Sequence, residues 1–199
     1  MKHVMALFCI LFSICAHAQF TKGDKFIGGT VNMTHINEKA NGTSTSIVGL
    51  SPSAGIFLNR NFALGISPRY SNYTYKDVVN GQLQNKQVVR TVGYGVFAKR
   101  FFTISDKFFF ALTGDVFFDR NTTIQQYPVS KTTTKSYAFG IEIRPSFIFF
   151  PSTHWGIEAS LGNLSYITNQ QLHATDTRSN QFDFSAGTFS LGFSYYLRK

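Results

Sequence analysis

The sequence predicts an all-β fold, an eight-stranded antiparallel barrel that crosses a membrane as an up-and-down meander after a cleaved signal peptide. Three observations predict it: side chains alternate with a period of two, the alternating segments are long, and the connections between them alternate in length. The alternation is clear in residues 108–119, where Phe108 and Leu112 belong to an apolar set and Asp115 belongs to the other set. A period of two is the repeat of a strand and not of a helix.

Eight segments carry this alternation, and at about 10 to 17 residues each is longer than the roughly 5 or 6 residues of an ordinary soluble strand. A tilted strand of about 9 to 11 residues is long enough to cross a membrane. The predicted strands are, in chain order, 24–36, 45–58, 62–75, 87–101, 108–120, 135–149, 155–167 and 181–197. An even number of strands is what the closure of a meander requires.

The connections between these segments alternate in length along the chain. The short ones are 59–61, 103–107 and 151–154, and the long ones, rich in Asn, Gln, Thr and Ser, are 37–44, 76–86, 121–134 and 168–180. Short turns at one end and long loops at the other are typical of outer-membrane barrels. Because every long connection follows an odd-numbered strand, both termini are predicted on the short-turn, periplasmic side.

The first 18 residues are predicted to be a signal peptide, which leaves 19–199 as the barrel domain. A short basic start precedes an apolar run, 4–14, that is too short to span a bilayer, and small residues follow it where a peptidase would cut before Gln19. A lipoprotein signal at Cys15 is the alternative. Cys9 and Cys15 both lie in the removed segment, so the mature chain has no disulfide and no thiol nucleophile.

The composition favours a membrane surface over nucleic acid as the partner of this chain. The net charge is +9, yet only 15% of the residues are charged and the basic ones are scattered singly. A nucleic-acid-binding protein usually gathers its basic residues on one face. Export also separates the chain from nucleic acid, so the positive charge fits a phosphate-rich membrane surface better.

Aromatic residues lie near both ends of the predicted strands, where belts at the two lipid headgroup levels are expected. Beside the short turns are Phe57, Phe62, Phe101, Phe102, Phe108, Phe149, Phe150, Trp155, Tyr195 and Tyr196. Near the long loops are Tyr70, Tyr73, Tyr75, Phe118, Tyr137, Tyr166, Phe182 and Phe184. These rings are expected to face lipid at the two membrane interfaces.

The last predicted strand reads GTFSLGFSYYLRK over 187–199 and places Phe189, Leu191, Phe193, Tyr195 and Leu197 at alternate positions. In this strand, and in its strand and loop pattern, the chain resembles the small eight-stranded outer-membrane barrels of Gram-negative bacteria, of the OmpX, OmpA transmembrane-domain and OmpW type. The resemblance covers nearly all of the mature chain. It implies a location in the cell outer membrane and four kinds of partner: outer-membrane lipids, lipopolysaccharide, the barrel assembly machinery, and extracellular partners bound through the loops.

The small and polar sets of the strands are predicted to face the barrel interior, and the large apolar sets to face lipid. The small sets hold mostly Gly, Ala and Ser, which suits the narrow interior of an eight-stranded barrel. The inward charges that this alternation predicts are Arg69, Lys99, Asp115, Glu142, Arg144 and Glu158. Because buried charges must be paired, these residues are expected to form a neutral network that plugs the barrel. An ion pathway or a substrate site is the alternative.

Three prolines, Pro52, Pro68 and Pro145, fall within predicted strands, where proline removes a hydrogen-bond donor from the ladder. All three belong to the outward set of side chains. Because a closed barrel has no edge strand to accommodate a proline, each of them is expected to mark a bulge.

The first functional hypothesis is a structural or surface-interaction role, and the second is a narrow conduit for small solutes. The third hypothesis is a lipid-modifying enzyme that would use His173, Asp176 and Ser179 of the last long loop. We expect the protein not to be an enzyme, because a mobile loop holds catalytic geometry poorly. No cofactor is expected. Residues 93–98 match the dinucleotide-binding fingerprint, but the chain continues after them as a strand, where that motif needs the start of a helix. No metal site is expected either, since the histidines lack ligand spacing.

Overall fold

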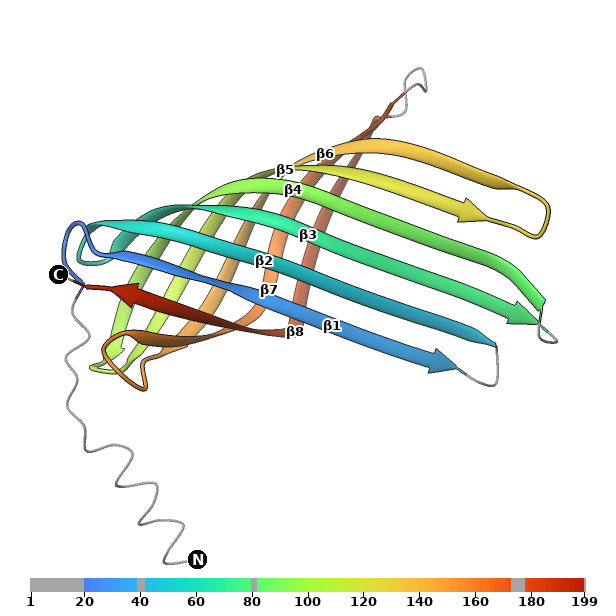
Figure 1. Ribbon diagram of the computed structural model, residues 1–199. Coiled ribbons are helices and arrows are strands. Elements are labelled where there is room, and N and C mark those ends of the chain that lie inside the picture. The colour runs from blue at the N-terminus through green and yellow to red at the C-terminus, as the bar shows by residue number, and fades with distance from the viewer. Residues whose placement is uncertain (1–19, 39–41, 80–81, 173–177, 199) are drawn as a thin grey trace, which may run out of the picture.

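A computed structural model describes residues 20–38, 42–79, 82–172 and 178–198, which form a closed antiparallel barrel (Figure 1). The strands are β1 (Lys25–Glu38), β2 (Thr43–Asn59), β3 (Phe62–Val79), β4 (Gln82–Ser105), β5 (Phe108–Gln126), β6 (Lys131–Phe149), β7 (Trp155–Gln171) and β8 (Arg178–Leu197). Each strand pairs with its neighbours in the chain and β8 pairs with β1, so the predicted meander is confirmed. Among the described residues, no helix is long and apolar enough to cross a membrane. The predicted signal peptide lies outside the described residues.

The strands extend well into the stretches that the sequence analysis assigned to long loops, so those loop boundaries are wrong. β4 begins at Gln82, and β5 continues to Gln126. Thr122 of β5 pairs with Lys135 of β6, and only 127–130 remain between these two strands. Polar composition does not prevent pairing, because Thr favours strands and Asn and Gln each keep a backbone N–H donor and C=O acceptor for the ladder.

The added length takes one end of the barrel beyond what a membrane requires. A tilted strand needs about 9 to 11 residues to cross, whereas β5 and β6 each have 19 residues. The start of β6, 131–134, has Lys131 and Thr133 on the outer face and Thr132 and Thr134 on the inner face, so neither face there suits hydrocarbon. The opposite end carries the three short turns and the two ends of the described chain, called the termini below, next to which Lys25 pairs with Leu197 (Figure 1).

The ladder that closes the barrel is the shortest of the eight. β1 and β8 pair only over residues 25–30 and 192–197, and Thr30 with Gly192 is the last pair. Among the described residues, β1 beyond Thr30 pairs with β2 and not with β8. Figure 1 shows β8 running away from β1 beyond this point. The wall is therefore closed at the end with the termini and parted between β1 and β8 toward the other end.

The prolines within strands are accommodated in two ways. Pro145 lies in a bulge of β6 against β7, as expected. Pro52 of β2 and Pro68 of β3 instead oppose each other in a gap of the ladder that shifts no register, so the bulges expected at these two are wrong. Proline has no backbone N–H donor. Because Pro52 and Pro68 face each other, the hydrogen bonds that they cannot make are missing at a single place in the wall.

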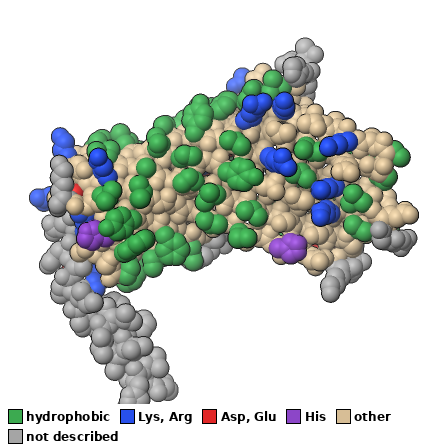
Figure 2. Space-filling model, viewed as in Figure 1, with side chains coloured by type: hydrophobic (Ala, Val, Ile, Leu, Met, Phe, Trp, Pro, Cys, Tyr) green, Lys and Arg blue, Asp and Glu red, His purple; other side chains and the backbone are tan. Residues whose placement is uncertain are grey.

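The outer surface of the wall is apolar between its two ends (Figure 2). On β3 to β6 the exposed side chains in this zone include Leu64, Ile66, Val92, Val96, Leu112, Val116, Phe139, Ile141 and Ile143. They occupy alternate positions, and the residues between them point into the barrel. This is the arrangement predicted for a lipid-facing wall, with large uncharged side chains outside and small or polar ones inside.

Replacement of Ile141 by arginine is expected to lower the free energy of unfolding by about 2–4 kcal/mol, because the charge would face hydrocarbon. Ile141 lies on the outer face of β6 and is 52% exposed. The measurement is urea unfolding in the presence of lipid vesicles. The control is Thr133→Arg, on the same face of the same strand but close to the hairpin tip. This substitution is expected to lower the free energy of unfolding by about 0.5 kcal/mol or less. Equal losses at the two positions would contradict a lipid-facing zone at Ile141.

Candidate functional site

Charged side chains from β3, β5 and β6 meet inside the barrel. A guanidinium nitrogen of Arg69 lies 3.1 Å from the Glu142 carboxylate. The same group lies 3.7 Å from Asp119 and 3.9 Å from Asp115. The Arg144 guanidinium lies 3.6 Å from Asp115 and 3.3 Å from Glu142. Two guanidinium groups are thus shared among three carboxylates.

The strand register explains why these cations are needed. Asp115 and Glu142 are direct cross-strand partners on β5 and β6, so two like charges oppose each other. The Asp115 side chain has no exposed area, which leaves little water to screen the repulsion. Arg144 on β6 and Arg69, which reaches across from β3, supply the opposite charge, and Ser67 donates a hydrogen bond of 3.1 Å to Asp115.

A second ion pair joins β4 to β7 across the interior. The Lys99 ammonium donates a hydrogen bond of 2.6 Å to one oxygen of the Glu158 carboxylate. The Ser146 hydroxyl on β6 donates a bond of 2.7 Å to the other oxygen. Both charged side chains are largely buried, so each depends on the other for the interactions that water would otherwise provide. The two ion-pair groups together are called the charged layer below.

Glycines make room for this layer on the facing strands. A Cβ atom at Gly95 would collide with the Asp115 carboxylate, and one at Gly140 would collide with the Phe117 ring. The Phe117 ring in turn lies 4.1 Å from the Arg69 guanidinium carbon, a cation–π contact that fixes the position of the guanidinium. The small residues of the inward sets are therefore required by the size of the charged and aromatic side chains opposite them.

Aromatic rings fill the interior at the end with the termini. Their exposed fractions are all 6% or less, and they are Phe20, Phe26, Phe57, Phe97, Phe101, Phe109, Phe150 and Tyr196. The Phe20 ring lies at the centre, stacked on Phe57 with centroids 4.1 Å apart. It also contacts Phe101, Phe109, Phe150 and Tyr196 at centroid distances of 5.1 to 5.6 Å. This set, called the aromatic layer, closes the barrel with a packed hydrophobic core.

The aromatic layer corrects part of the predicted lipid-facing belts. Phe57, Phe101, Phe150 and Tyr196 were expected outside and lie inside, whereas Phe102, Phe108, Phe149 and Trp155 are exposed on the outer surface. Where two rings are adjacent, as in Phe101 and Phe102, the alternation of a strand sends one ring to each face. At the other end, Tyr73 and Tyr75 share the inward face with Arg69 by the unbroken register of β3 with β4, so they are not belt residues either.

A tight turn at 21–24 brings Phe20 into the interior. The Thr21 N–H and hydroxyl both donate to the Asp24 carboxylate, at 2.8 and 2.9 Å. Gly23 has a φ of 92°, which favours glycine, and its N–H donates to the Phe57 carbonyl at 2.8 Å. The Arg198 guanidinium covers the Phe20 ring at 5.0 Å. Burial lowers the pKa of Arg198, and the nearby Asp24 carboxylate opposes that shift.

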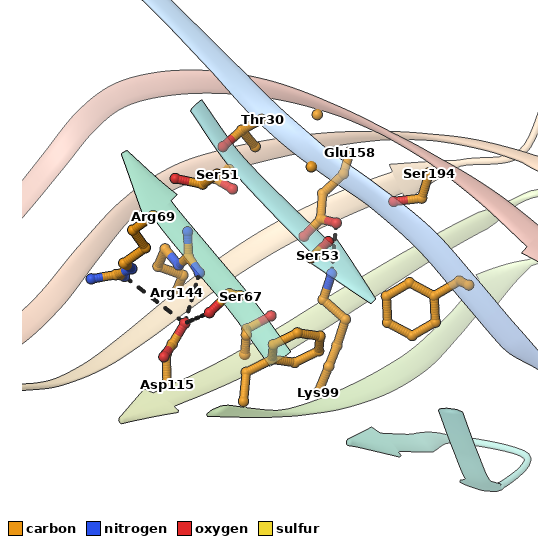
Figure 3. A pocket seen from close by; sticks show the side chains of 16 residues that line it. Thr30, Ser51, Ser53, Ser67, Arg69, Lys99, Asp115, Arg144, Glu158 and Ser194 are labelled. Atoms are coloured by element: carbon orange, nitrogen blue, oxygen red, sulfur yellow. Dashed lines mark hydrogen bonds and ion pairs between the residues drawn. The ribbon is translucent and has the colours of Figure 1, made fainter. Parts of the chain in front are cut away.

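A cavity of about 70 Å³ lies between the two layers and the end of the β1–β8 ladder. Figure 3 shows ion pairs of the charged layer around this cavity, with hydroxyl side chains among and beside them. These hydroxyls belong to Thr30, Ser51, Ser53 and Ser194. Pockets that hold small-molecule ligands usually measure about 300–1,000 Å³. The cavity is large enough for water molecules and too small for a ligand of ordinary size.

The comparisons with known proteins give structural likeness only. No family model matches the chain, and no curated protein matches it. The chain is similar in structure to the N-terminal β-barrel domain of OprF from Pseudomonas aeruginosa, with a TM-score of 0.41, 11% identity, and coverage of 88% of this chain and 98% of that one. It is also similar to Ail, the attachment invasion locus protein of Yersinia pestis, with a TM-score of 0.45, 15% identity, and coverage of 88% and 99%.

Both similar structures are small eight-stranded outer-membrane barrels. The fold of this chain is established by its own strand pairing, in which each strand pairs with the next and β8 pairs with β1.

All six charged residues predicted from the sequence lie inside the barrel and take part in ion pairs. They are Arg69, Lys99, Asp115, Glu142, Arg144 and Glu158. The sequence analysis missed Asp119, although alternation from Asp115 puts it on the same face. With Asp119, four carboxylates face three cations, so the charged layer is not the balanced set that was expected.

The remaining sequence candidates give no second site. His173 and Asp176 of the hypothetical enzyme lie outside the described residues, and Ser179 lies in β8 near the end opposite the termini. Residues 93–98, which match the dinucleotide fingerprint, belong to β4. Within the described residues, no three His, Cys, Asp or Glu side chains are grouped in a way that could hold a metal ion.

Proposed function

We propose that the protein is a non-enzymatic barrel of the Gram-negative outer membrane, with a structural or surface-interaction role and with both termini in the periplasm. The observation that carries the proposal is the contrast between the two faces of the wall. The outer face is apolar, and the interior is filled by the charged and aromatic layers. A barrel with an apolar outside and a filled inside is suited to remain in a membrane without conducting.

The charged and aromatic layers argue against an open pore, because the two layers together fill most of the interior. The charged layer ties β3, β4, β5, β6 and β7 together across the interior. The aromatic layer leaves Phe57 and Phe150 with no exposed area. Charged side chains that are bound to one another are poorly available to a passing ion or to a substrate. These contacts favour the structural role over the conduit and the enzyme.

The long hairpins support surface interaction as the more specific role. They extend beyond the apolar zone on the side opposite the termini, which is the extracellular side in this proposal. Their polar side chains and paired backbone give a rigid surface that stands away from the membrane. We place any extracellular partner there, while the barrel assembly machinery inserts the chain from the periplasmic side and outer-membrane lipids and lipopolysaccharide surround the wall.

Two measurements on the purified full chain test this proposal. Folded protein is expected to migrate differently on a detergent gel before and after boiling, and to fractionate with the outer membrane in cells. In planar bilayers the wild-type protein is expected to show no steady conductance. Solubility without detergent, with no shift on heating, would exclude the membrane barrel. Steady conductance would exclude the sealed interior and leave the conduit, whose favourable observation is the cavity beside the β1–β8 ladder.

A further inference from the structure

Six basic side chains stand on the outer face of β3 to β6, toward the end of the barrel opposite the termini. They are Lys76, Lys86, Arg90, Arg120, Lys131 and Lys135, and they are called the basic belt. Figure 2 shows Lys and Arg side chains collected over this half of the wall, beyond its hydrophobic middle. A group of like charges on one surface is repulsive unless it binds something of opposite charge.

The strand register places these residues in rows. Lys76 pairs with Lys86, which pairs with Gln126, which pairs with Lys131, so three lysines stand in one row across four strands. A second row runs from Arg90 through Thr122 to Lys135. In the third row, Arg120 lies beside Tyr137. Because like charges directly opposite each other are destabilising, the Lys76–Lys86 pair in particular calls for an external anion.

No acidic side chain on these strands can neutralise the belt. The acidic residues of β3 to β6 are Asp77, Asp115, Asp119 and Glu142, and all of them share the inward face. On the other four strands, Arg178 is the one described Lys or Arg on the outer face of this half of the barrel. Apart from Arg178, the described positive charge on the outer face of this half therefore lies in one sector of the wall and is not balanced within that sector.

A row of aromatic rings beside the belt fixes its depth in the membrane. Tyr94 and Phe118 have centroids 5.9 Å apart, and Phe118 stacks on Tyr137 at 5.3 Å, all on the outer face. Rings of this kind prefer the level of the lipid headgroups. The belt begins at the row of Tyr137 and continues away from the apolar zone. Arg120 and the row of Arg90 and Lys135 thus lie next to the rings, where lipid phosphates lie. The row of Lys76, Lys86 and Lys131 lies farther out, toward the hairpin tips.

We propose that the basic belt binds the phosphate groups of anionic lipids in the leaflet opposite the termini, along the β3–β6 sector only. This inference rests on the proposed membrane location and specifies the lipid contacts of the barrel. The lipid phosphates supply the counter-charge that the wall lacks, and lysine and arginine each bind phosphate oxygens by charge-assisted hydrogen bonds. The other sector, without such a row, contacts neutral lipid.

The test compares Arg90→Gln/Arg120→Gln/Lys135→Gln with a control that removes three exposed basic residues at the other end, Lys25→Gln/Arg60→Gln/Arg100→Gln. Each protein is placed in phosphatidylcholine nanodiscs with increasing amounts of diphosphoryl lipid A, and bound lipid A is counted by native mass spectrometry. The belt variant is expected to bind lipid A about a hundredfold more weakly, at about fivefold for each removed charge near a membrane surface. The control variant is expected to bind like the wild type.

Equal binding by the belt variant and the wild type would overturn the proposal, and so would an equal loss in the control variant. Monophosphoryl lipid A separates recognition of phosphate from recognition of acyl chains. The wild type is expected to bind it more weakly than the diphosphoryl form, whereas the belt variant is expected to bind the two forms equally. Belt-dependent binding of heparin to the protein in neutral detergent, without binding of lipid A, would assign the belt to a soluble polyanion instead. A heat-induced gel shift of each variant shows that the barrel itself is intact, so failure of the belt is distinguishable from failure of the fold.

Discussion

Replacement of Lys99 by methionine is expected to lower the free energy of unfolding by about 3–5 kcal/mol, because it leaves the Glu158 carboxylate buried without its cation. Lys99 is 7% exposed, and its ammonium lies 2.6 Å from that carboxylate. Methionine keeps the length and most of the volume of the lysine stem, so packing changes little. The measurement is urea unfolding in lipid vesicles, followed by tryptophan fluorescence from Trp155.

The double variant Lys99→Met/Glu158→Gln separates a stranded charge from lost packing. Removing both charges is expected to restore most of the stability, since a buried pair replaced as a unit is often close to neutral. Arg60→Gln serves as a surface control and is expected to change the free energy by about 0.5 kcal/mol or less. A double variant no more stable than Lys99→Met would show that Glu158 is not the cause of the loss.

Replacement of Phe20 by alanine is expected to cost about 3–5 kcal/mol and to open a route through the barrel. The Phe20 ring has an exposed fraction of 1% and contacts five other rings of the aromatic layer. It belongs to no strand, so its removal leaves the backbone ladders untouched. Planar-bilayer recording is expected to show conductance in the variant where the wild type shows none.

The control for this variant is Phe102→Ala, which removes the same side chain at the same end of the barrel but from its outer face. It is expected to leave conductance at zero. A closed Phe20→Ala barrel with normal stability would show that the ring does not seal the interior. Conductance in both variants would point to general loosening of the wall at this end.

The alternation of side chains was sufficient to predict the eight strands and the inward face of the six charged residues named from the sequence. Asp115 and Arg144 were assigned inward from parity alone, because a period of two leaves no other choice once one face is apolar. The strand ends could not be predicted in the same way. In 131–134 both faces are polar, so the alternation disappears although the backbone remains paired. Strands that extend above a membrane carry no signal of period two.

The aromatic layer was the larger gap in the sequence analysis. Phe101 and Phe102 are chemically identical neighbours, and their roles differ only by the face on which each lies. Phe20 precedes every strand, and a turn around Gly23 places it in the interior. Its contacts come from residues distant in sequence, such as Phe150 and Tyr196, and only the closed barrel brings them together.

The position of Phe20 sets the order in which the molecule can fold. Its ring is held by residues of β2, β4, β5 and β8 and by Phe150 after β6, so its site is absent until the last strand has arrived. The last strand is joined to the first by the shortest ladder in the barrel, next to the turn that carries Phe20. Closure of the wall and sealing of the interior are therefore expected to occur together, late in folding. Amide hydrogens in residues 25–30 and 192–197 would report that event as the last to gain protection from exchange.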